Sequence, residues 1–301
     1  MMIHRASSHS ILTLADGFHR RQREKLLLIW RSPRILIGLC VILGFLSCAV
    51  FAPWISPHDP LKMDLVAKYR QPSVEHLLGT DYIGRDILSR LIWGTRVSLY
   101  TAVFAISFAV AIGILLGVTG GFFGGKVDII ISRFVDIMLA LPAFIMAIVL
   151  MGVLGRGLLN MIVAIGVGMS PRIARVVRGS TLTVKENEFV EGARSFGYGD
   201  WRIIFRHIIP HSLTPVVVYA TLLLGSAVMI EAGLSFLGLG IPPPTPTWGQ
   251  MVSEGMDVMR DLPWISTTAG LSIVILVLGF NLLGDGLRDQ LDPRLRGEVQ
   301  E

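Results

Sequence analysis

The sequence has little charge and only two cysteines in its 301 residues. Charged residues make up 16% of it, against about 25% in soluble domains, while hydrophobic residues make up 52%. This balance argues against an ordinary soluble domain and indicates a chain that lies in lipid. Cys40 and Cys48 both fall inside one apolar run, which is typical of cysteines facing lipid or a neighbouring helix. Nothing in their placement predicts a disulfide framework.

The sequence also lacks a catalytic motif. Its seven histidines are scattered, and neither H-E-x-x-H nor G-x-S-x-G occurs. Residues 120–126 fit the first seven positions of the phosphate-binding pattern G-x-x-x-x-G-K-[ST], but Val127 takes the hydroxyl position. An apolar run precedes this stretch where a phosphate loop has a strand, so we predict a glycine-rich cytoplasmic turn. We therefore expect no enzyme, and no cofactor or metal ion held by this chain.

The apolar residues that are present gather into long runs, which predict an all-α membrane protein with six transmembrane helices. The predicted spans are residues 35–55, 97–117, 129–154, 158–177, 213–230 and 265–283. The first run is long enough to span and has no cleavage site of small residues, so we interpret it as a retained helix and not as a signal peptide.

Basic residues predict the orientation of the spans. The net charge of +5 is spread between the hydrophobic blocks, which favours a membrane topology over nucleic-acid binding. Arginines in segment 1–34 place the N-terminus in the cytoplasm, and arginines in the tail 286–301 do the same for the C-terminus. Segments 56–96 and 231–263 are then external. In the first of them, the alternation from Ile87 to Trp93 predicts a short helix lying along the membrane surface.

Three residues of the predicted spans are candidates to line a pathway. Asp136 follows Arg133 by three residues, so the two can pair near the cytoplasmic end of their helix, or Asp136 can face a pathway. Pro142, in the middle of the same span, predicts a kink. Glu231 lies near the outer end of the fifth span, where it could line a route or reach interfacial water.

A long polar interval, residues 185–215, separates the fourth and fifth spans. The spacing from Glu188 to Phe196 predicts a short amphipathic helix. Residues 197–199 break it, and Asp200 is predicted to cap a second helix that begins at Trp201. The apolar or small residues on one side of the first helix are Phe189, Gly192, Ala193 and Phe196. A membrane protein with such a cytoplasmic unit and no energy-converting site needs a partner.

The same interval carries a family resemblance. Glu191-Gly192-Ala193-x-x-x-Gly197, followed after nine residues by His-Ile-Ile-Pro at 207–210, resembles the signature E-A-A-x-x-x-G-(nine)-I-x-L-P of binding-protein-dependent ABC importer permeases. It departs from the signature at Gly192, His207 and Ile209.

Three more segments narrow the resemblance to the C-type permease of the dipeptide, oligopeptide and nickel importers. They are Gly-Thr-Asp-x-x-Gly-Arg-Asp-x-x-Ser-Arg at 79–90, Leu-Ser-Phe-Leu-Gly-Leu-Gly with Pro-Pro-Thr-Pro-x-Trp-Gly at 234–249, and Phe-Asn-Leu-Leu-Gly-Asp-Gly-Leu-Arg-Asp-x-Leu-Asp-Pro at 280–293. Together they cover the chain from about residue 20 to 296.

The resemblance implies a type I ABC importer permease fold in a bacterial inner membrane, with residues 185–210 as the coupling segment. Glu191, Gly192, Ala193 and Gly197 would carry the docking to an ATPase. The neighbouring Phe189 and Phe196 would anchor that contact, and Arg194 would pair with Glu191 or reach across the interface.

The implied partners are a second homologous permease, two cytoplasmic ATPase subunits that bind ATP and Mg²⁺, and a periplasmic or lipid-anchored solute-binding protein. The implied substrate is a dipeptide or short peptide. Import of a nickel chelate is the alternative within the family. A self-sufficient channel or secondary transporter is the alternative outside it.

Overall fold

A computed structural model describes residues 32–291, and this part of the chain is mostly helical, with one long connection, residues 56–86, and no strand. Five of its helices are long and apolar enough to cross a membrane, or six if the bent pair α4 and α5 counts as one span. The helices are α2 (Pro33–Ile55), α3 (Ile87–Phe123), α4 (Gly125–Leu139), α5 (Ala143–Leu154), α6 (Leu158–Lys185), α7 (Glu188–Ser195), α8 (Asp200–Ile203), α9 (Ile209–Phe236), α10 (Trp248–Met256) and α11 (Trp264–Leu291).

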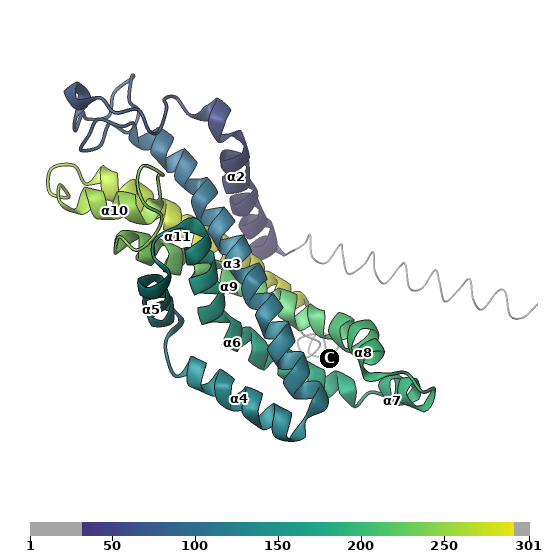
Figure 1. Cartoon of the computed structure of the whole chain (residues 1–301). Coiled ribbons are helices and arrows are strands. Elements are labelled where there is room, and N and C mark those ends of the chain that lie inside the picture. The colour runs from purple at the N-terminus through teal and green to yellow at the C-terminus, as the bar shows by residue number, and fades with distance from the viewer. Residues whose placement is uncertain (1–31, 292–301) are drawn as a thin grey trace, which may run out of the picture.

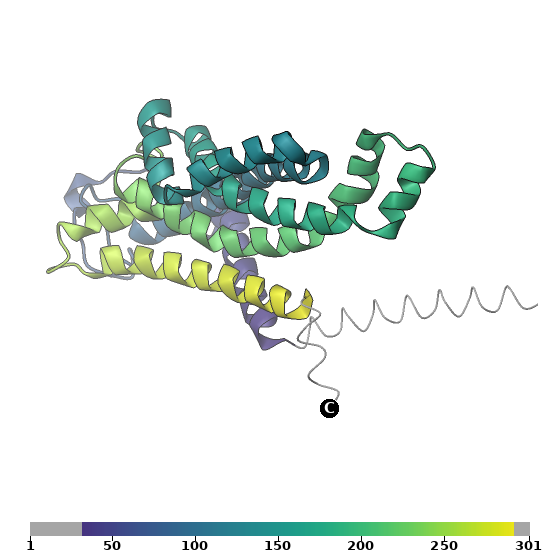
Figure 2. The ribbon, with the colours of Figure 1, turned by 90° about the horizontal axis from the view of Figure 1, so that it is seen from below.

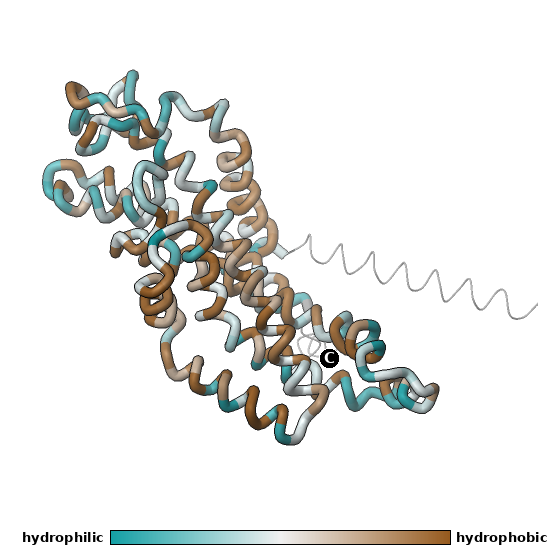
Figure 3. The backbone as a smooth tube through the Cα atoms, in the orientation of Figure 1, coloured by the Kyte–Doolittle hydropathy of each residue, from teal (hydrophilic) through white to brown (hydrophobic). Residues whose placement is uncertain are grey.

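The long helices form one bundle, in which α3 packs against α6, α9 and α2, and α11 packs against α2 and α9 (Figure 1). Helix α10 and the segment 56–86 lie at one end of the bundle, which we name the α10 end. Helices α7 and α8 project from the opposite end, named the α7 end (Figure 2). Hydrophobic residues dominate the long helices, whereas hydrophilic residues gather at the two ends (Figure 3). This is the distribution expected of a bundle whose middle lies in lipid.

Two predictions about helix boundaries near α3 were wrong. Residues 87–93 form the first turns of α3 and not a separate surface helix, because the helix continues without a break from Ile87 to Phe123. Asp86 caps its start by accepting a hydrogen bond from the Ser89 N–H. At its other end α3 continues to Phe123, and α4 begins at Gly125. The predicted glycine-rich turn is therefore reduced to Gly124.

The predicted third span is broken and not merely kinked. Helices α4 and α5 meet at an angle of 89°. Pro142 sits immediately before α5, where its missing N–H leaves no hydrogen bond to continue the α4 ladder. The fourth span is longer than predicted, because α6 runs through Pro171 to Lys185.

The second helix of the polar interval is not independent. Its N-cap is Gly199 and not Asp200, and α8 leads through a π-helical turn, Ile204–Ile208, directly into α9. The fifth span therefore begins earlier than predicted. It also ends later, so that the loop after it starts at Leu237 and contains α10.

Glycines let α3 approach α6 closely. Gly113, Gly117 and Gly121 are spaced one turn apart on the same side of α3. A methyl group added at Gly117 would lie 2.6 Å from both the Ala174 carbonyl oxygen and Val177 Cβ, and methyl groups at the other two would meet α6 at 2.6 to 2.9 Å. Small residues at such positions allow helix backbones to pack in a membrane, where no hydrophobic effect drives the helices together.

We expect Gly117→Leu to lower the free energy of unfolding by about 1–3 kcal/mol, because the added atoms must push α6 away. Gly44→Leu on α2 is the matched control, since a methyl group there would meet no atom within 4 Å. Thermal unfolding midpoints of the detergent-solubilised variants test this. Equal midpoints for the two variants would show that the approach of α3 to α6 is not a tight one.

Candidate functional site

Helix α7 sits at the end of the bundle as predicted, with bounds within one residue of those expected. The pattern did not predict which side of the helix packs against the rest of the chain. Val190 and Ala193 are buried against the rest of the chain, while Phe189 and Phe196 are exposed. The helix has apolar residues on two sides, and the sequence pattern joined them into one. Val190, one turn before Ala193, is the signal that the pattern missed.

The end of α7 is fixed by a hydrogen-bonded glycine turn. The Gly197 N–H donates to the Arg194 carbonyl (2.9 Å), and the Tyr198 N–H donates to the Ala193 carbonyl (3.1 Å). Gly197 has φ of +75°, the left-handed conformation that this C-terminal cap requires and that side chains disfavour. The direction in which the chain leaves α7 is therefore set by the backbone itself.

Side chains connect α7 to two long helices. The Phe189 ring stacks on the His211 ring of α9 at a centroid distance of 4.8 Å. The Arg194 guanidinium lies 5.6 Å from the centre of the Phe122 ring, at the last turn of α3. Among the described residues Arg194 thus faces an aromatic ring and has no ion pair with Glu191. A movement of α7 would therefore change its contacts with both α9 and α3.

The outer surface of the α7 end is apolar as well as charged. Phe196, Trp201 and Phe205 are 84%, 68% and 65% exposed, and the last two stack on each other. Glu191 on α7 is also exposed, and Gly192 has no atom within 4 Å of where a methyl group would lie. Large aromatic side chains gathered on one projecting surface are typical of a protein interface.

Two ion pairs hold α4 against α6. Arg178 donates through Nε and Nη2 to the two oxygens of Asp128 (2.5 and 2.6 Å), and Arg175 donates to Asp136 (2.7 Å). The predicted pairing of Asp136 with Arg133 was wrong, because the bend after α4 lays its acidic side along α6. The partners lie 39 and 50 residues apart in sequence, so no helical spacing could reveal them.

Of the pathway candidates, Asp136 lines a cavity and the other two occupy structural positions. The cavity, of about 230 Å³, lies between α3, α4 and α6, and Arg175 and Arg178 also line it. Pro142 forms the junction of α4 and α5. Glu231 is fully buried and accepts hydrogen bonds from the hydroxyls of Ser98 on α3 and Ser235 on α9, both at 2.9 Å. It therefore does not reach interfacial water, and a pathway role for these residues stays a prediction.

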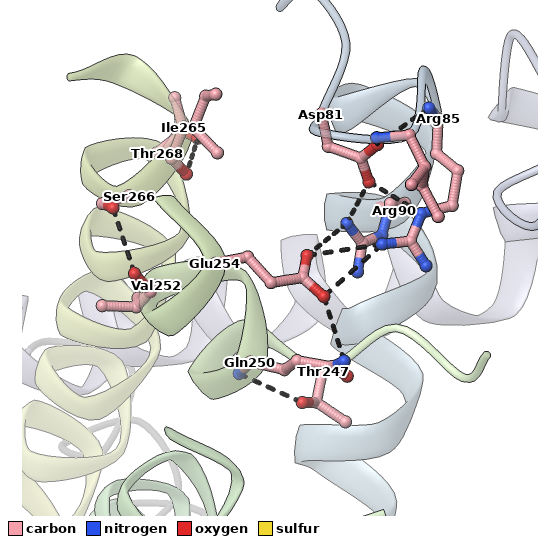
Figure 4. Close-up of polar contacts among 11 residues, drawn as sticks. Asp81, Arg85, Arg90, Thr247, Gln250, Val252, Glu254, Ile265, Ser266 and Thr268 are labelled. Carbon is pink, nitrogen blue, oxygen red and sulfur yellow. Dashed lines mark hydrogen bonds and ion pairs between the residues drawn. The ribbon is translucent and has the colours of Figure 1, made fainter. Parts of the chain in front are cut away.

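A buried ion network at the α10 end was not predicted. It consists of Asp81, Arg85, Arg90 and Glu254, so two guanidinium groups face two carboxylates (Figure 4). Arg85 donates to Asp81 at 2.7 Å, and Arg90 donates both to Asp81 and, at 2.7 Å, to Glu254. The network joins the loop before α3 to α10, although the two segments are over 160 residues apart in sequence.

Trp248 strengthens the same junction. It is fully buried, and its indole N–H donates to the Leu91 carbonyl at 2.9 Å. Gly94 leaves room for the ring, because a methyl group there would lie 2.8 Å from it. The motifs that contain Asp81 and Trp248 therefore build one contact between α3 and α10.

We expect Glu254→Ala to lower the free energy of unfolding by about 3–5 kcal/mol, because two buried guanidinium groups would share one carboxylate. Glu75→Ala removes a carboxylate that pairs with Arg70 on the exposed surface, and should change it by less than about 1 kcal/mol. Thermal unfolding of the purified chains measures both. A Glu254→Ala protein as stable as the Glu75→Ala protein would contradict a stabilising network.

The comparisons with known proteins agree with this architecture. Residues 109–297 match the family described as binding-protein-dependent transport system inner membrane component. Residues 29–72 match the N-terminal transmembrane domain of oligopeptide transport permease C. Among solved structures, the chain is similar to the MetNI methionine ABC transporter in inward-facing conformations, with a TM-score of 0.53 and 24% identity over 68% of this chain and 97% of that one. This structural likeness shows the fold.

Two curated relatives are similar over most of their length. The dipeptide transport system permease protein DppC of Alkalihalophilus pseudofirmus is 40% identical over 91% of this chain and 90% of its own. The glutathione transport system permease protein GsiD of Escherichia coli is 44% identical over 86% of both chains. With a type I importer fold, both family matches and these relatives, the chain belongs to the binding-protein-dependent transport system inner membrane components, as a C-type ABC importer permease.

Proposed function

We propose that this permease forms half of a transmembrane pathway that imports a dipeptide or another short peptide, and that α7 is the element through which an ATPase drives it. The observation that carries the proposal is the place of α7. Phe196 and Glu191 are exposed on this projecting helix, while Val190 and Ala193 are buried against the rest of the chain. Phe189 and Arg194 contact the spanning helices α9 and α3.

The proposed complex contains a second, homologous permease, two ATPase subunits that bind ATP and Mg²⁺, and a solute-binding protein. The α7 end and both termini then lie in the cytoplasm, and the α10 end lies outside the bacterial inner membrane, where a binding protein can deliver its ligand. The positive-inside distribution of basic residues supports this orientation.

The contacts of α7 suggest how the two ends communicate. When the ATPase subunits close, they would shift α7 through its exposed side. The Phe189–His211 stack passes that shift to α9, and the Arg194–Phe122 contact passes it to α3. Since Glu231 joins α9 to Ser98 on α3, the two helices would move together and open the pathway to one side or the other.

The relatives' names supply the substrate class. One is called a dipeptide permease and the other a glutathione permease, and both ligands are short peptides. We extend this class to the present chain. The binding protein would set the choice among individual peptides, because it captures the ligand first.

We expect Gly197→Asp to abolish uptake while the complex stays assembled and continues to hydrolyse ATP. An aspartate side chain makes the φ of +75° at Gly197 less favourable than glycine does, so the cap that orients α7 would be weakened. Gly199→Asp is the matched control, because Gly199 has φ of −68° and is the N-cap of α8, where aspartate is favoured. Both activities are measured on reconstituted complexes.

Normal uptake by the Gly197→Asp complex would contradict the role of α7. Loss of ATP hydrolysis together with loss of assembly would point to a folding defect, and the milder Gly197→Ala would then decide, since it keeps the strain without adding a charge.

The peptide assignment is tested by uptake into vesicles that contain the full complex, with its binding protein outside. We expect ATP-dependent uptake of a labelled dipeptide that unlabelled dipeptide and glutathione reduce and that a nickel chelate leaves unchanged. Vesicles containing this permease alone are the control and should take up nothing. Nickel uptake, or transport by the permease alone, would replace the proposal with one of the alternatives.

A further inference from the structure

Two histidines and an aspartate converge at the α10 end, outside the ion network described above. His58 follows the end of α2, His76 lies in the loop between α2 and α3, and Asp86 is the N-cap of α3. One potential ligand atom from each of the three lies within 4.8 Å of the other two. Nδ1 of His76 is 2.9 Å from Oδ1 of Asp86, and Nδ1 of His58 is 3.7 Å from the same oxygen.

Local hydrogen bonds hold these residues in place. Oδ2 of Asp86 accepts from both the N–H and the hydroxyl of Ser89, at 2.8 and 2.6 Å, which leaves Oδ1 facing the histidines. The backbone N–H of His58 donates to the same serine hydroxyl at 3.0 Å, and the N–H of His76 donates to the Ser73 hydroxyl. Outer hydrogen bonds of this kind orient the ligands of metal sites.

A purely structural explanation accounts for only part of the cluster. A hydrogen bond between His76 and Asp86 would be sufficient to satisfy the buried carboxylate. That hydrogen bond does not explain the position of His58, whose Nδ1 atom is buried and has no hydrogen-bond partner among the described residues. It also does not explain why two imidazole rings lie 4.6 Å apart beside the same carboxylate oxygen.

We propose that His58, His76 and Asp86 bind a divalent transition-metal ion such as Zn²⁺ or Ni²⁺. Two imidazole nitrogens and a carboxylate oxygen suit these ions better than Ca²⁺ or Mg²⁺, which favour oxygen ligands alone. Ligand atoms bound to one ion at about 2.0–2.2 Å lie roughly 3–3.5 Å from one another, and the separations of 2.9 and 3.7 Å from Oδ1 of Asp86 are close to this range. The side chain of His58 is 34% exposed, so an ion can enter from solvent and keep water at its remaining positions.

A bound ion would tie the end of α2 to the loop and to the first turn of α3. It would be a fixed part of the permease and not its cargo, and the proposal does not depend on which solute the importer carries. No sequence pattern indicates the site, because its ligands are 18 and 10 residues apart and match no metal-binding motif.

Zn²⁺ titration of the assembled transporter tests the proposal, with the proteins purified without a histidine tag and stripped by a chelator. We expect one tightly bound Zn²⁺ per permease and a rise in the permease's unfolding temperature on adding Zn²⁺. His58→Ala should weaken binding by at least about tenfold and abolish that rise. His58 makes no side-chain hydrogen bond to the α3 cap, so the variant should fold.

His211→Ala is the matched control, since it removes a histidine at the α7 end and should leave the tight Zn²⁺ site intact. The same titration with Ni²⁺ should follow the same pattern. Binding by the wild type that is no tighter than binding by His58→Ala would overturn the proposal, as would equal losses in His58→Ala and His211→Ala. Neither result would affect the peptide-import assignment, which is read from uptake.

Discussion

The packing of α3 against α6 fixes the positions of the groups attached to both ends of α3. Three glycines one turn apart allow the contact, and α3 runs 37 residues, or about 55 Å, along it. A bilayer's hydrocarbon core is about 30 Å thick, so both ends of such a helix extend beyond it. One end carries Asp86 and Arg90 into the contacts with α10 and segment 56–86, and the other places Phe122 next to Arg194 of α7. The same helix therefore reaches the proposed docking surface and the opposite face.

Hydrogen bonds and ion pairs between polar side chains join the helices of this bundle. An unpaired charge is costly where water is excluded, and three buried or partly buried carboxylates are each joined to a neighbouring helix. Glu231 links α9 to Ser98 of α3, Arg178 links α6 to Asp128 of α4, and Glu254 links α10 to Arg90 of α3. These bonds hold the helices in register, and they also connect them mechanically. A shift of one helix must break such a bond or carry its neighbour along.

The site was predictable where its residues are close in sequence. The bounds of α7 and the glycine break after it follow from the pattern between Glu188 and Gly197, because helix periodicity and turn chemistry act over a few residues. The buried side of α7 did not follow. A short helix with apolar residues on both sides gives no indication of which side meets its own chain, and Phe189 and Phe196 proved to be exposed while Val190 is buried.

The sequence by itself determined that this is a helical membrane protein, roughly where its spans lie, and which permease family it resembles. Hydrophobic length and local motifs carry that information, because the bilayer acts on each span separately. Tertiary structure alone decided that α4 and α5 meet at 89°, that Asp136 pairs with Arg175 of α6, and that His58, His76 and Asp86 meet. These contacts depend on how helices pack in three dimensions, and residues that meet across helices are unrelated in spacing along the chain.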